Sequence, residues 1–576
     1  MQYIAATCFF LSGVAGLVLE VLWTKMLTLV FGSTTLAAAT TVAAFMGGLS
    51  LGSALSPRLL KAGRSPLVVY AVLEGAIGLY ALAVPSLFES IPGMQSWLWP
   101  MLPQGPVWFS LARFVITFSV LLVPTTAMGA TLPILSSFFV KGREDSGATV
   151  GGLYALNTAG AFAGTVAAGF LLIPALGVMH TNIMAAGIDL MVGATITAAW
   201  LARSRSARVA ASPVRSLSTP PTRSGQRIIL LCALTAGFAS MALQILWTRA
   251  LSVVIGSSTY SFTIIISAFL GGLAIGAAIY SRMLHRRRDT AGDLCMLMIF
   301  IGVSAFVCSS CVDRLPFVLQ SLLELKTLTM LRLHLFNYFV TWLAIFLPTL
   351  AMGATFPLLI HIYTGSSSSV TRDVGRLYSV NTIGNILGAA LAVFLIIPVL
   401  GIRSGLVAMT VVYLLLAAVV ALSFSDPSRL RRRRIQAATA VLCAVAAISL
   451  APRWNVATWS AGMFRIYLVR TVFAGHEFRT PKLVYHRDGM VTTVTVERRG
   501  ESLSMKVNGK VDASNGGDMH TQILSGLWPM LLHGGARDAA MVGYGSGVTA
   551  GAILRFPLDT FRVIELESAV FEAAGS

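Results

Sequence analysis

The first 424 residues alternate between long apolar runs and short polar loops that are rich in arginine. A run of about 20 apolar residues is long enough to cross a lipid bilayer as a helix. We expect twelve such spans, near 3–31, 35–57, 66–89, 107–140, 147–176, 181–202, 228–255, 259–281, 291–311, 335–363, 374–401 and 404–424. The pattern therefore predicts a polytopic α-helical membrane protein.

The chain contains an internal repeat. Pro124-Thr-Thr-Ala-Met-Gly-Ala-Thr-Leu-Pro133 returns as Pro348-Thr-Leu-Ala-Met-Gly-Ala-Thr-Phe-Pro357, 224 residues later. The same offset relates further pairs, namely Tyr154 to Tyr378, Asn157 to Asn381, Pro174 to Pro398, and Glu20 to Gln244. Six spans per repeat is an even number, so both repeats enter the membrane in the same sense. Parallel repeats of this kind are found in transporters.

The repeats divide the chain into segments. Residues 1–202 and 228–424 are the two six-helix repeats, joined by a basic, Ser- and Pro-rich cytoplasmic linker at 203–227. A basic hinge at 425–434 precedes a shorter apolar segment, 435–452. We expect this segment to be a thirteenth span, which would carry the rest of the chain across the membrane. The alternative is an interfacial or re-entrant segment, which would leave the C-terminal region on the inner side.

The C-terminal region has the pattern of a soluble α/β domain. Within 453–538, alternating β-branched residues with Arg-Gly and Asn-Gly turns predict antiparallel strands, and a helix follows these strands near 518–532. Residues 539–576 then predict a strand, a glycine-rich turn, a helix and a second strand, which is the start of a Rossmann-like domain. A doubly wound domain needs more than two strands, so we expect this one to be cut short at Ser576.

Composition agrees with a membrane protein and sets its orientation. The chain is 56% hydrophobic and 11% charged, with a mean hydropathy of +0.78 and a net charge of +19. With the N-terminus inside, the inner loops hold 22 Lys and Arg residues and the outer loops hold four. Basic residues placed in this way are topology signals rather than a nucleic-acid surface. We expect a multi-pass protein of the inner cell membrane with a cytoplasmic N-terminus and with the lipid bilayer as its first partner.

Gly543-Tyr-Gly-Ser-Gly547 is the clearest candidate binding site. Glycines allow a turn to approach a ligand closely, and Glu565, about 20 residues on, ends the next strand, where an acid can accept hydrogen bonds from a ribose. The alternative is a tight βα turn without any ligand.

The C-terminal motifs resemble the spermidine synthase family. They are Val507-Asn-Gly-Lys-Val-Asp-Ala-Ser514, Asp518-Met-His-Thr-Gln522, the glycine turn and Val563-Ile-Glu-Leu-Glu567, spread over roughly 480–576. With its duplicated membrane region, the chain resembles the fused membrane form of this family. Gly52-Ser-Ala-Leu-Ser-Pro-Arg58 through Arg64 also resembles a loop of the major facilitator superfamily.

This resemblance implies a small β-domain ahead of a Rossmann-like aminopropyltransferase domain. Glu565 would hold the ribose of decarboxylated S-adenosylmethionine, and Gly543, Gly545 and Gly547 would line its nucleoside. Gln522 and Asp518 belong to the segment that faces this co-substrate. The implied reaction is aminopropyl transfer to putrescine or a related amine. No bound cofactor and no metal are expected.

The sequence departs from the family at three places. Ser546 stands where soluble members have an Asp in the glycine turn, and Asp512 stands where they have a Gln. The catalytic Asp of the family lies on a later strand, beyond Ser576. The catalytic residues therefore stay unknown.

The membrane half has its own candidate residues. Ionisable groups in lipid cost a few kcal/mol, so Glu20, Lys25, Glu74, Arg113 and Asp189 are expected to face a cavity. Glu20 is the strongest candidate for a functional residue. The alternative is that Glu20 pairs with Lys25 and serves only assembly. Pro124 and Pro348 are expected to break helices beside a central site, and a packing kink is the alternative. Asn157 and Asn381 are expected to hydrogen-bond across helices.

Three functions stay open at this point. The first is a membrane protein with an aminopropyltransferase domain. The second is a transporter of a polyamine or another small cationic or amphiphilic solute, with a non-catalytic C-terminal domain. The third is a scaffold. Nucleic acid is not expected as a partner, and an oligomer is left open.

Overall fold

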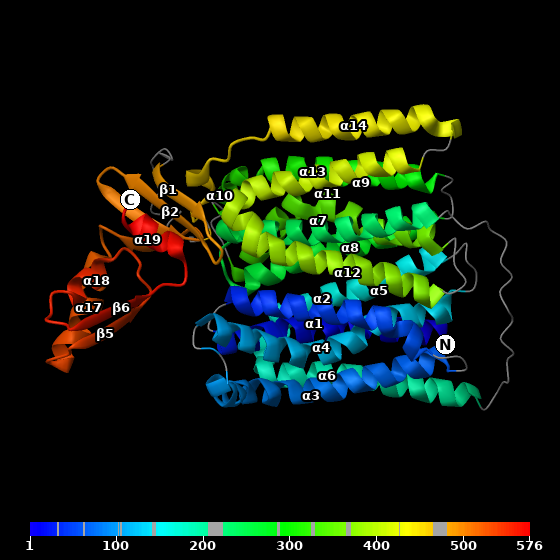
Figure 1. The fold of residues 1–576 in the computed structure, drawn as a ribbon, viewed down its shortest axis with the longest axis horizontal. Helices are drawn as coiled ribbons and strands as arrows, with labels where there is room; N and C mark the ends of the chain where they lie inside the picture. The colour runs from blue at the N-terminus through cyan, green and yellow to red at the C-terminus, as the bar shows by residue number, and fades with distance from the viewer. Residues whose placement is uncertain are drawn as a thin grey trace.

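The computed structural model describes residues 1–31, 34–60, 64–101, 103, 106–140, 146–204, 223–284, 289–323, 329–364, 370–424, 427–462, 464 and 481–576. Most of the predicted linker at 203–227 lies outside these residues. Figure 1 shows a bundle of long helices that run roughly side by side, with a smaller region of strands and short helices at one end. The chain is therefore a helical membrane-type bundle joined to a C-terminal α/β region.

Each repeat contributes six long helices to the described part of the bundle. The first repeat has α1 (Gln2–Phe31), α2 (Thr34–Leu59), α3 (Pro66–Leu98), α4 (Pro106–Phe139), α5 (Ser146–Ala167) and α6 (Ile173–Ser204). The second has α7 (Arg223–Ile255), α8 (Thr259–Met283), α9 (Thr290–Ser310), α11 (Met330–Thr364), α12 (Val370–Leu391) and α13 (Ile397–Ser423), with the short α10 (Leu315–Leu323) before α11. Within the described residues, nine apolar helical segments are long enough to cross a membrane, two of them being the continuous pairs α5–α6 and α12–α13.

The 224-residue repeat recurs in the packing of the helices. A Cβ atom added to Gly13 of α1 would lie 2.3 Å from the carbonyl oxygen of Asn157 of α5, and one added to Gly237 of α7 would lie 2.3 Å from that of Asn381 of α12. These distances leave no room for a side chain, so the helix backbones touch at equivalent points in both halves. Small residues at such contacts are how helices approach closely in lipid. The predicted fold class of two parallel six-helix repeats is confirmed.

The prolines do not break their helices, which corrects the expectation for Pro124 and Pro348. Both lie inside continuous helices, α4 and α11. Proline lacks the N–H that would bond the carbonyl four residues earlier, and neighbouring hydroxyls can replace that donor. The Tyr80 hydroxyl donates to the Val120 carbonyl (3.1 Å), four residues before Pro124.

The non-helical backbone lies instead after the π-helical turns that follow α5 and α12. These turns span Ala168–Leu172 and Ala392–Ile396. The kinks lie at Gly177 (φ 73°) and Gly401 (φ 78°), which are equivalent positions of the two repeats. A positive φ is favourable for glycine alone among common residues, so each glycine permits a sharp change of direction.

The two halves pack against each other through small residues. The hydroxyls of Ser50 on α2 and Ser379 on α12 are hydrogen-bonded at 2.9 Å. Gly151 on α5 lies against Ser281 and Pro357 of the second half, and its equivalent Gly375 lies against α2. Each half therefore inserts one of its helices between those of the other.

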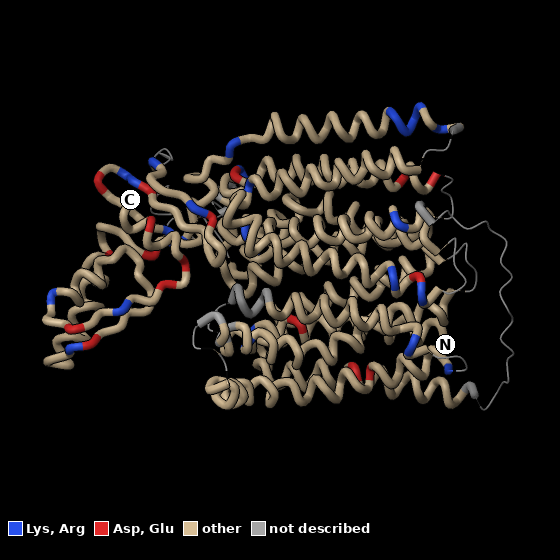
Figure 2. The backbone as a smooth tube through the Cα atoms, in the orientation of Figure 1, with Lys and Arg blue, Asp and Glu red and all other residues tan. Residues whose placement is uncertain are grey.

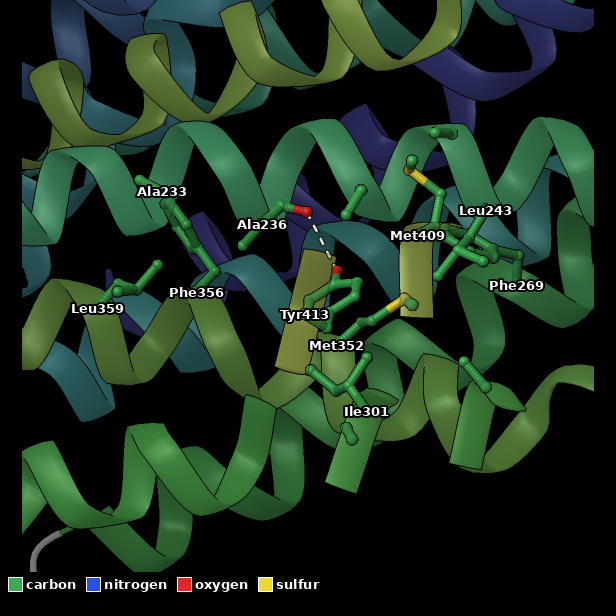
Figure 3. Packing of buried hydrophobic residues seen from close by; sticks show 14 of the residues in the cluster. Ala233, Ala236, Leu243, Phe269, Ile301, Met352, Phe356, Leu359, Met409 and Tyr413 are labelled. Carbon is green, nitrogen blue, oxygen red and sulfur yellow. Dashed lines mark hydrogen bonds between the residues drawn. The ribbon is translucent and has the colours of Figure 1, made fainter. Parts of the chain in front are cut away.

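The largest buried cluster lies around α7, α8, α11 and α13. Figure 3 shows part of it, including Leu243, Phe269, Met352 and Tyr413, with the Tyr413 hydroxyl donating to the Ala236 carbonyl at 3.1 Å. A buried tyrosine hydroxyl needs such a partner because unsatisfied polar groups are costly in an apolar core.

Helix α14 (Leu430–Ser449) begins inside the predicted basic hinge, so Arg431 to Arg434 are helical rather than a loop. It packs beside α13 and α9 and runs along the length of the bundle (Figure 1). Arg433 is buried and pairs with Asp289 at 2.5 Å, and Arg429 pairs with Asp289 at 3.0 Å. These ion pairs fix the N-terminal end of α14 to the loop before α9.

The C-terminal region contains two sheets. The first is an antiparallel meander of β1 (Lys482–Asp488), β2 (Thr493–Arg499), β3 (Ser502–Val507) and β4 (Lys510–Ser514), as the sequence pattern predicted. After α17 (Met519–His533), the parallel pair β5 (Asp538–Val542) and β6 (Thr560–Ile564) is joined by α18 (Val548–Ile553) and followed by α19 (Ser568–Ala574). The short α15 (Val456–Trp459) lies between α14 and this region.

The C-terminal region lies at the end of the bundle opposite the N-terminus (Figure 1). Within the bundle, most of the Lys and Arg residues lie toward the end that carries the N-terminus (Figure 2). This distribution is what the positive-inside rule predicts for a cytoplasmic N-terminus.

We therefore expect the C-terminus to lie on the outer side of the membrane. Alkaline phosphatase fused after Ser576 should be active, and a fluorescent protein that matures only in the cytoplasm should be dark there. A fusion after Ser204 is the control and should give the reverse result. A bright fluorescent protein after Ser576 would contradict this orientation.

Candidate functional site

A cavity of about 1010 Å³ lies between the two halves of the bundle. Its lining comes from α1, α2, α4 and α5 of the first half, and from α7, α8, α11, α12 and α13 of the second. Glu20, Asn157 and Asn381 line it, together with Gln244, the repeat equivalent of Glu20. Lys25, Pro124 and Pro348 are not among its lining residues. Arg113 also lines the cavity, whereas Glu74 and Asp189 do not, which corrects the expectation for these two acids. The structure therefore brings four of the nine predicted membrane candidates to one central site.

Glu20 is a half-buried carboxylate on the wall of this cavity. Its side chain makes no hydrogen bond or ion pair with any residue that the structure describes. Lys25 is exposed and does not pair with it, so the alternative interpretation of a Glu20–Lys25 assembly pair is wrong. The two residues are five positions apart on α1, and side chains meet at spacings of three or four. A carboxylate that faces a cavity without a partner is available to a ligand.

Asn157 and Asn381 occupy equivalent places on α5 and α12. Both line the cavity. Gly13 packs closely against the backbone carbonyl of Asn157, and Gly237 packs in the same way against that of Asn381. The expected side-chain hydrogen bond across helices is not seen for either residue within the described chain. Their backbones pack the helices, and their amides face the cavity.

Aromatic rings connect the two halves at the cavity wall. The ring of Phe356 on α11 lies 5.0 Å from that of Tyr154 and 5.6 Å from that of Tyr378. The two tyrosines are repeat equivalents on α5 and α12, and all three residues line the cavity. Aromatic faces attract cations by about 0.5–2 kcal/mol, most strongly where water is excluded.

The glycine turn of the C-terminal region has the predicted backbone. Gly543, Gly545 and Gly547 all have positive φ angles, of 85°, 56° and 81°. Glu565, just after β6, holds this turn, because its Oε2 accepts from the Tyr544 amide at 2.7 Å. Its Oε1 accepts from the Glu567 amide at 3.0 Å.

Gln522 reaches the same turn from the other side, and Asp518 holds Gln522 in place. The Ser546 hydroxyl donates to Gln522 Oε1, and Gln522 Nε2 donates to the Ser514 carbonyl at 2.8 Å and to Asp518 Oδ2 at 3.1 Å. Asp518 Oδ2 also accepts from the Ser514 amide at 3.0 Å. Five of the six predicted residues of the nucleoside site thus form or contact one turn, and the sixth, Asp518, contacts it only through Gln522.

The C-terminal region is fixed to the bundle through Arg249 at the end of α7. Its guanidinium donates to the carbonyls of Met490 at 2.9 Å and Gly489 at 3.0 Å, in the turn between β1 and β2. The next amide of that turn, Val491, donates to Glu567 Oε2 at 2.9 Å. Arg249 also lines the cavity, so one residue touches both the cavity and the C-terminal region.

Asp488 makes a second attachment. Its Oδ2 accepts from the Ile402 amide of α13 at 2.9 Å, and its Oδ1 accepts from the Thr493 hydroxyl at 2.9 Å. Burial raises the pKa of Asp488, but His486, 3.4 Å away, and these two hydrogen bonds outweigh burial and hold the pKa below its usual value. The buried carboxylate therefore favours the attached arrangement as long as it is charged.

Comparison with known proteins finds similarity to a polyamine aminopropyltransferase from Corynebacterium efficiens. The two are 28% identical over 244 residues, which is 42% of this chain and 44% of that protein. The chain is thus, over part of its length, a homologue of a polyamine aminopropyltransferase. The predicted resemblance is confirmed to that extent. The matched length exceeds the whole region from 453 to 576, so it includes residues of the helical bundle.

Two solved structures are also similar in their arrangement of helices. They are the fucose:proton symporter FucP from E. coli and a second structure of FucP, a major facilitator superfamily transporter in its outward conformation. Sequence identities are 11% and 14%, each covers 74% of this chain and 98% of the other, and the TM-score is 0.44 for both. No family model matches the chain.

The residues that attach the C-terminal region were missed by sequence reasoning. Arg249 was visible only as the repeat partner of Lys25, and Asp488 only as the end of a strand. A basic residue kept at the end of a span, ahead of a soluble region, is the signal that could have drawn attention to Arg249.

The lowered pKa of Asp488 predicts a pH-dependent attachment. A group whose pKa is lower in the folded state contributes stability above its unfolded pKa of about 3.9 and loses it as the pH falls through its folded value. At pH 7, Asp488→Asn should therefore weaken the attachment by about 1.5–3 kcal/mol and lower the melting temperature of the full chain by a few degrees.

Melting followed by tryptophan fluorescence between pH 7 and pH 3 tests this. The wild type should lose stability toward pH 3 more steeply than Asp488→Asn. The control Asp559→Asn should behave as the wild type, since the Asp559 side chain is 66% exposed and lies 3.7 Å from Arg537. Parallel pH curves for wild type and Asp488→Asn would contradict the assignment.

Proposed function

We propose that the protein is a membrane carrier for small amphiphilic organic cations, with polyamines as the substrate class. The observation that carries this proposal is the central cavity, with the unpartnered carboxylate of Glu20 on its wall. The partial homology to an aminopropyltransferase supports a role in the chemistry of amines. The partners are then the lipid bilayer and a small-molecule amine.

The charges around the cavity favour a cation beside Glu20. Among the described lining residues, Glu20 is the only acidic one. Two arginines, Arg113 and Arg249, also line the cavity. The Arg249 guanidinium is engaged by the turn between β1 and β2. An amine that leaves water needs a compensating partner, because an unpaired charge in an apolar site is costly. Glu20 supplies the opposite charge and the rings of Tyr154, Phe356 and Tyr378 supply apolar, cation-attracting faces.

The repeat explains how such a site could open to each side in turn. In transporters built from parallel repeats, one half rocks against the other around a site at their interface. Here the cavity lies at that interface. Small residues at the contacts, such as Ser50 and Ser379, allow the halves to slide without side-chain clashes. A cavity between equivalent helices is the arrangement that alternating access requires.

The Glu20 carboxylate is therefore expected to be needed for transport. In proteoliposomes, Glu20→Gln should reduce uptake of radiolabelled spermidine at least tenfold, since about 1.4 kcal/mol of lost binding is a factor of ten. Gln244 shows that an amide fits the equivalent position, so the variant should fold.

Two further measurements complete this test. Gln244→Glu keeps Glu20 and adds a second acid, so it should retain uptake. Melting curves of all three proteins check folding. Equal uptake by wild type and Glu20→Gln would exclude the carboxylate, and no uptake by a folded wild type would contradict the carrier itself.

A second candidate function is supported by the glycine turn. We propose that the turn at 543–547 binds an adenosyl compound, with decarboxylated S-adenosylmethionine as the class implied by the homology. Each Glu565 oxygen accepts one backbone hydrogen bond and retains a second lone pair for a ribose hydroxyl. If the C-terminal region lies outside, as we expect, this site faces away from the cytoplasm, and ligand sensing fits it better than aminopropyl transfer.

Glu565→Gln tests the adenosyl site. The change keeps the shape but removes the charge, so it should weaken binding of adenosyl compounds to the full chain by about 1.5–3 kcal/mol. Isothermal titration measures the affinity, and Glu501→Gln, an exposed change in the same region, is the control. Unchanged affinity in folded Glu565→Gln would mean that this residue serves the turn alone.

A further inference from the structure

A pair of buried acids lies between α3 and α6, outside the cavity lining. Glu74 has no exposed surface and Asp189 is 1% exposed. The helices touch on both sides of the pair. A Cβ on Gly78 would lie 2.7 Å from the Ala186 carbonyl, and one on Gly193 would lie 2.9 Å from the Ala71 carbonyl. These contacts place Glu74 and Asp189 opposite each other on the two facing helices.

The pair lacks the partners that buried carboxylates need. Glu74 Oε1 accepts from the Ser12 hydroxyl of α1 at 2.8 Å, whereas Glu74 Oε2 and Asp189 Oδ2 are buried without any hydrogen bond. The hydroxyl of Tyr70, one turn before Glu74, is fully buried beside this carboxylate. Among the described residues, no Lys, Arg or His pairs with either acid.

The titratable groups around the pair are few. Cys8 faces it from α1, Tyr70 from α3 and Asp189 from α6, while α4, which also packs on α3, contributes none among the described residues. Two negative charges in such surroundings repel each other and are poorly solvated, and one proton shared between them relieves both costs.

The second repeat shows that the fold itself does not require these acids. The offset of 224 residues relates Ser12 to Ala236, Glu74 to Met298 and Asp189 to Tyr413. Met298 and Tyr413 are buried in the same way, and the Tyr413 hydroxyl donates to the Ala236 carbonyl (Figure 3). The second half therefore fills the equivalent place with a satisfied, uncharged pair. The acids of the first half cost stability that a neutral pair avoids, which points to a function.

We propose that Glu74 and Asp189 form a proton-binding site that exchanges its proton with the central cavity through Ser12. Ser12 both lines the cavity and donates to Glu74, so it connects the two. On release, the proton leaves a carboxyl oxygen for water in the cavity, and the pair is left with two negative charges. On uptake, the reverse transfer restores the shared proton. That this exchange accompanies solute passage rests on the proposed carrier function; the proton site itself does not.

Infrared spectroscopy of the full chain tests the site without any solute. All proteins in this test carry Glu20→Gln. The protein that retains both Glu74 and Asp189 should show the carbonyl band of a protonated carboxyl at pH 7, and this band should disappear as the pH is raised. The band should be lost in Glu74→Gln. It should persist in Glu89→Gln, which removes an exposed acid of the same helix.

The repeat supplies a second variant that keeps the test decisive if Glu74→Gln does not fold. Glu74→Met with Asp189→Tyr installs the pair of the second half, and it should fold and lack the band. A band that survives in either folded variant overturns the proposal. Absence of the band from the wild type at pH 7 would also overturn the proposal. So would loss of the wild-type band when Na⁺ is added at constant pH, because this would indicate that the pair binds a metal cation instead of a proton.

Coupling is measured separately in proteoliposomes with a pH-sensitive dye inside. Spermidine uptake by the wild type should change the internal pH, and Glu74→Met with Asp189→Tyr should abolish this change while retaining exchange of labelled for unlabelled spermidine. Loss of uptake in the wild type would count against the carrier function, and the infrared result would still decide the proton site. A pH change of wild-type size in the doubly substituted protein would overturn the coupling.

Discussion

The structure depends on one constraint, which is that a helical bundle in lipid must satisfy its polar groups internally. The two repeats meet it in the same way, by bringing helix backbones together at glycines such as Gly13 and Gly237. Where proline removes a donor, a distant hydroxyl replaces it, as Tyr80 does for the Val120 carbonyl and Ser53 for the Gly129 carbonyl, four residues before Pro133. Small residues and hydroxyls thus hold the bundle together.

Measured against that constraint, three acids of the first half are exceptions. Glu20 faces the cavity without a partner, and Glu74 and Asp189 are buried with unsatisfied oxygens. All three are replaced by uncharged residues in the second half, at Gln244, Met298 and Tyr413. The same fold is therefore compatible with neutral residues at these positions. This difference between the halves indicates that packing of the bundle does not need the three acids. We therefore assign the acids to binding.

Sequence reasoning succeeded where the signal is local or repeated. The long helices of the two repeats, the repeat itself, the strand meander and the glycine turn with Glu565 follow from periodicity and turn chemistry. The helix break expected at Pro124 was wrong, because the hydroxyl that rescues the helix lies 40 residues away on α3. The attachment through Arg249 was missed for a similar reason, since its partners lie 240 residues further on. The Glu74–Asp189 pairing also depends on how two helices pack.

The central cavity and the glycine turn are both candidate binding sites, and Arg249 links the cavity to the C-terminal region through the turn at 489–492. The decisive experiment must therefore show which of the two sites binds the amine. Equilibrium binding of radiolabelled spermidine to the purified full chain does this most directly. We expect saturable binding that Glu20→Gln weakens at least tenfold and Glu565→Gln leaves unchanged. Binding that survives in Glu20→Gln and is lost in Glu565→Gln would place the amine at the glycine turn and contradict the assignment of the cavity.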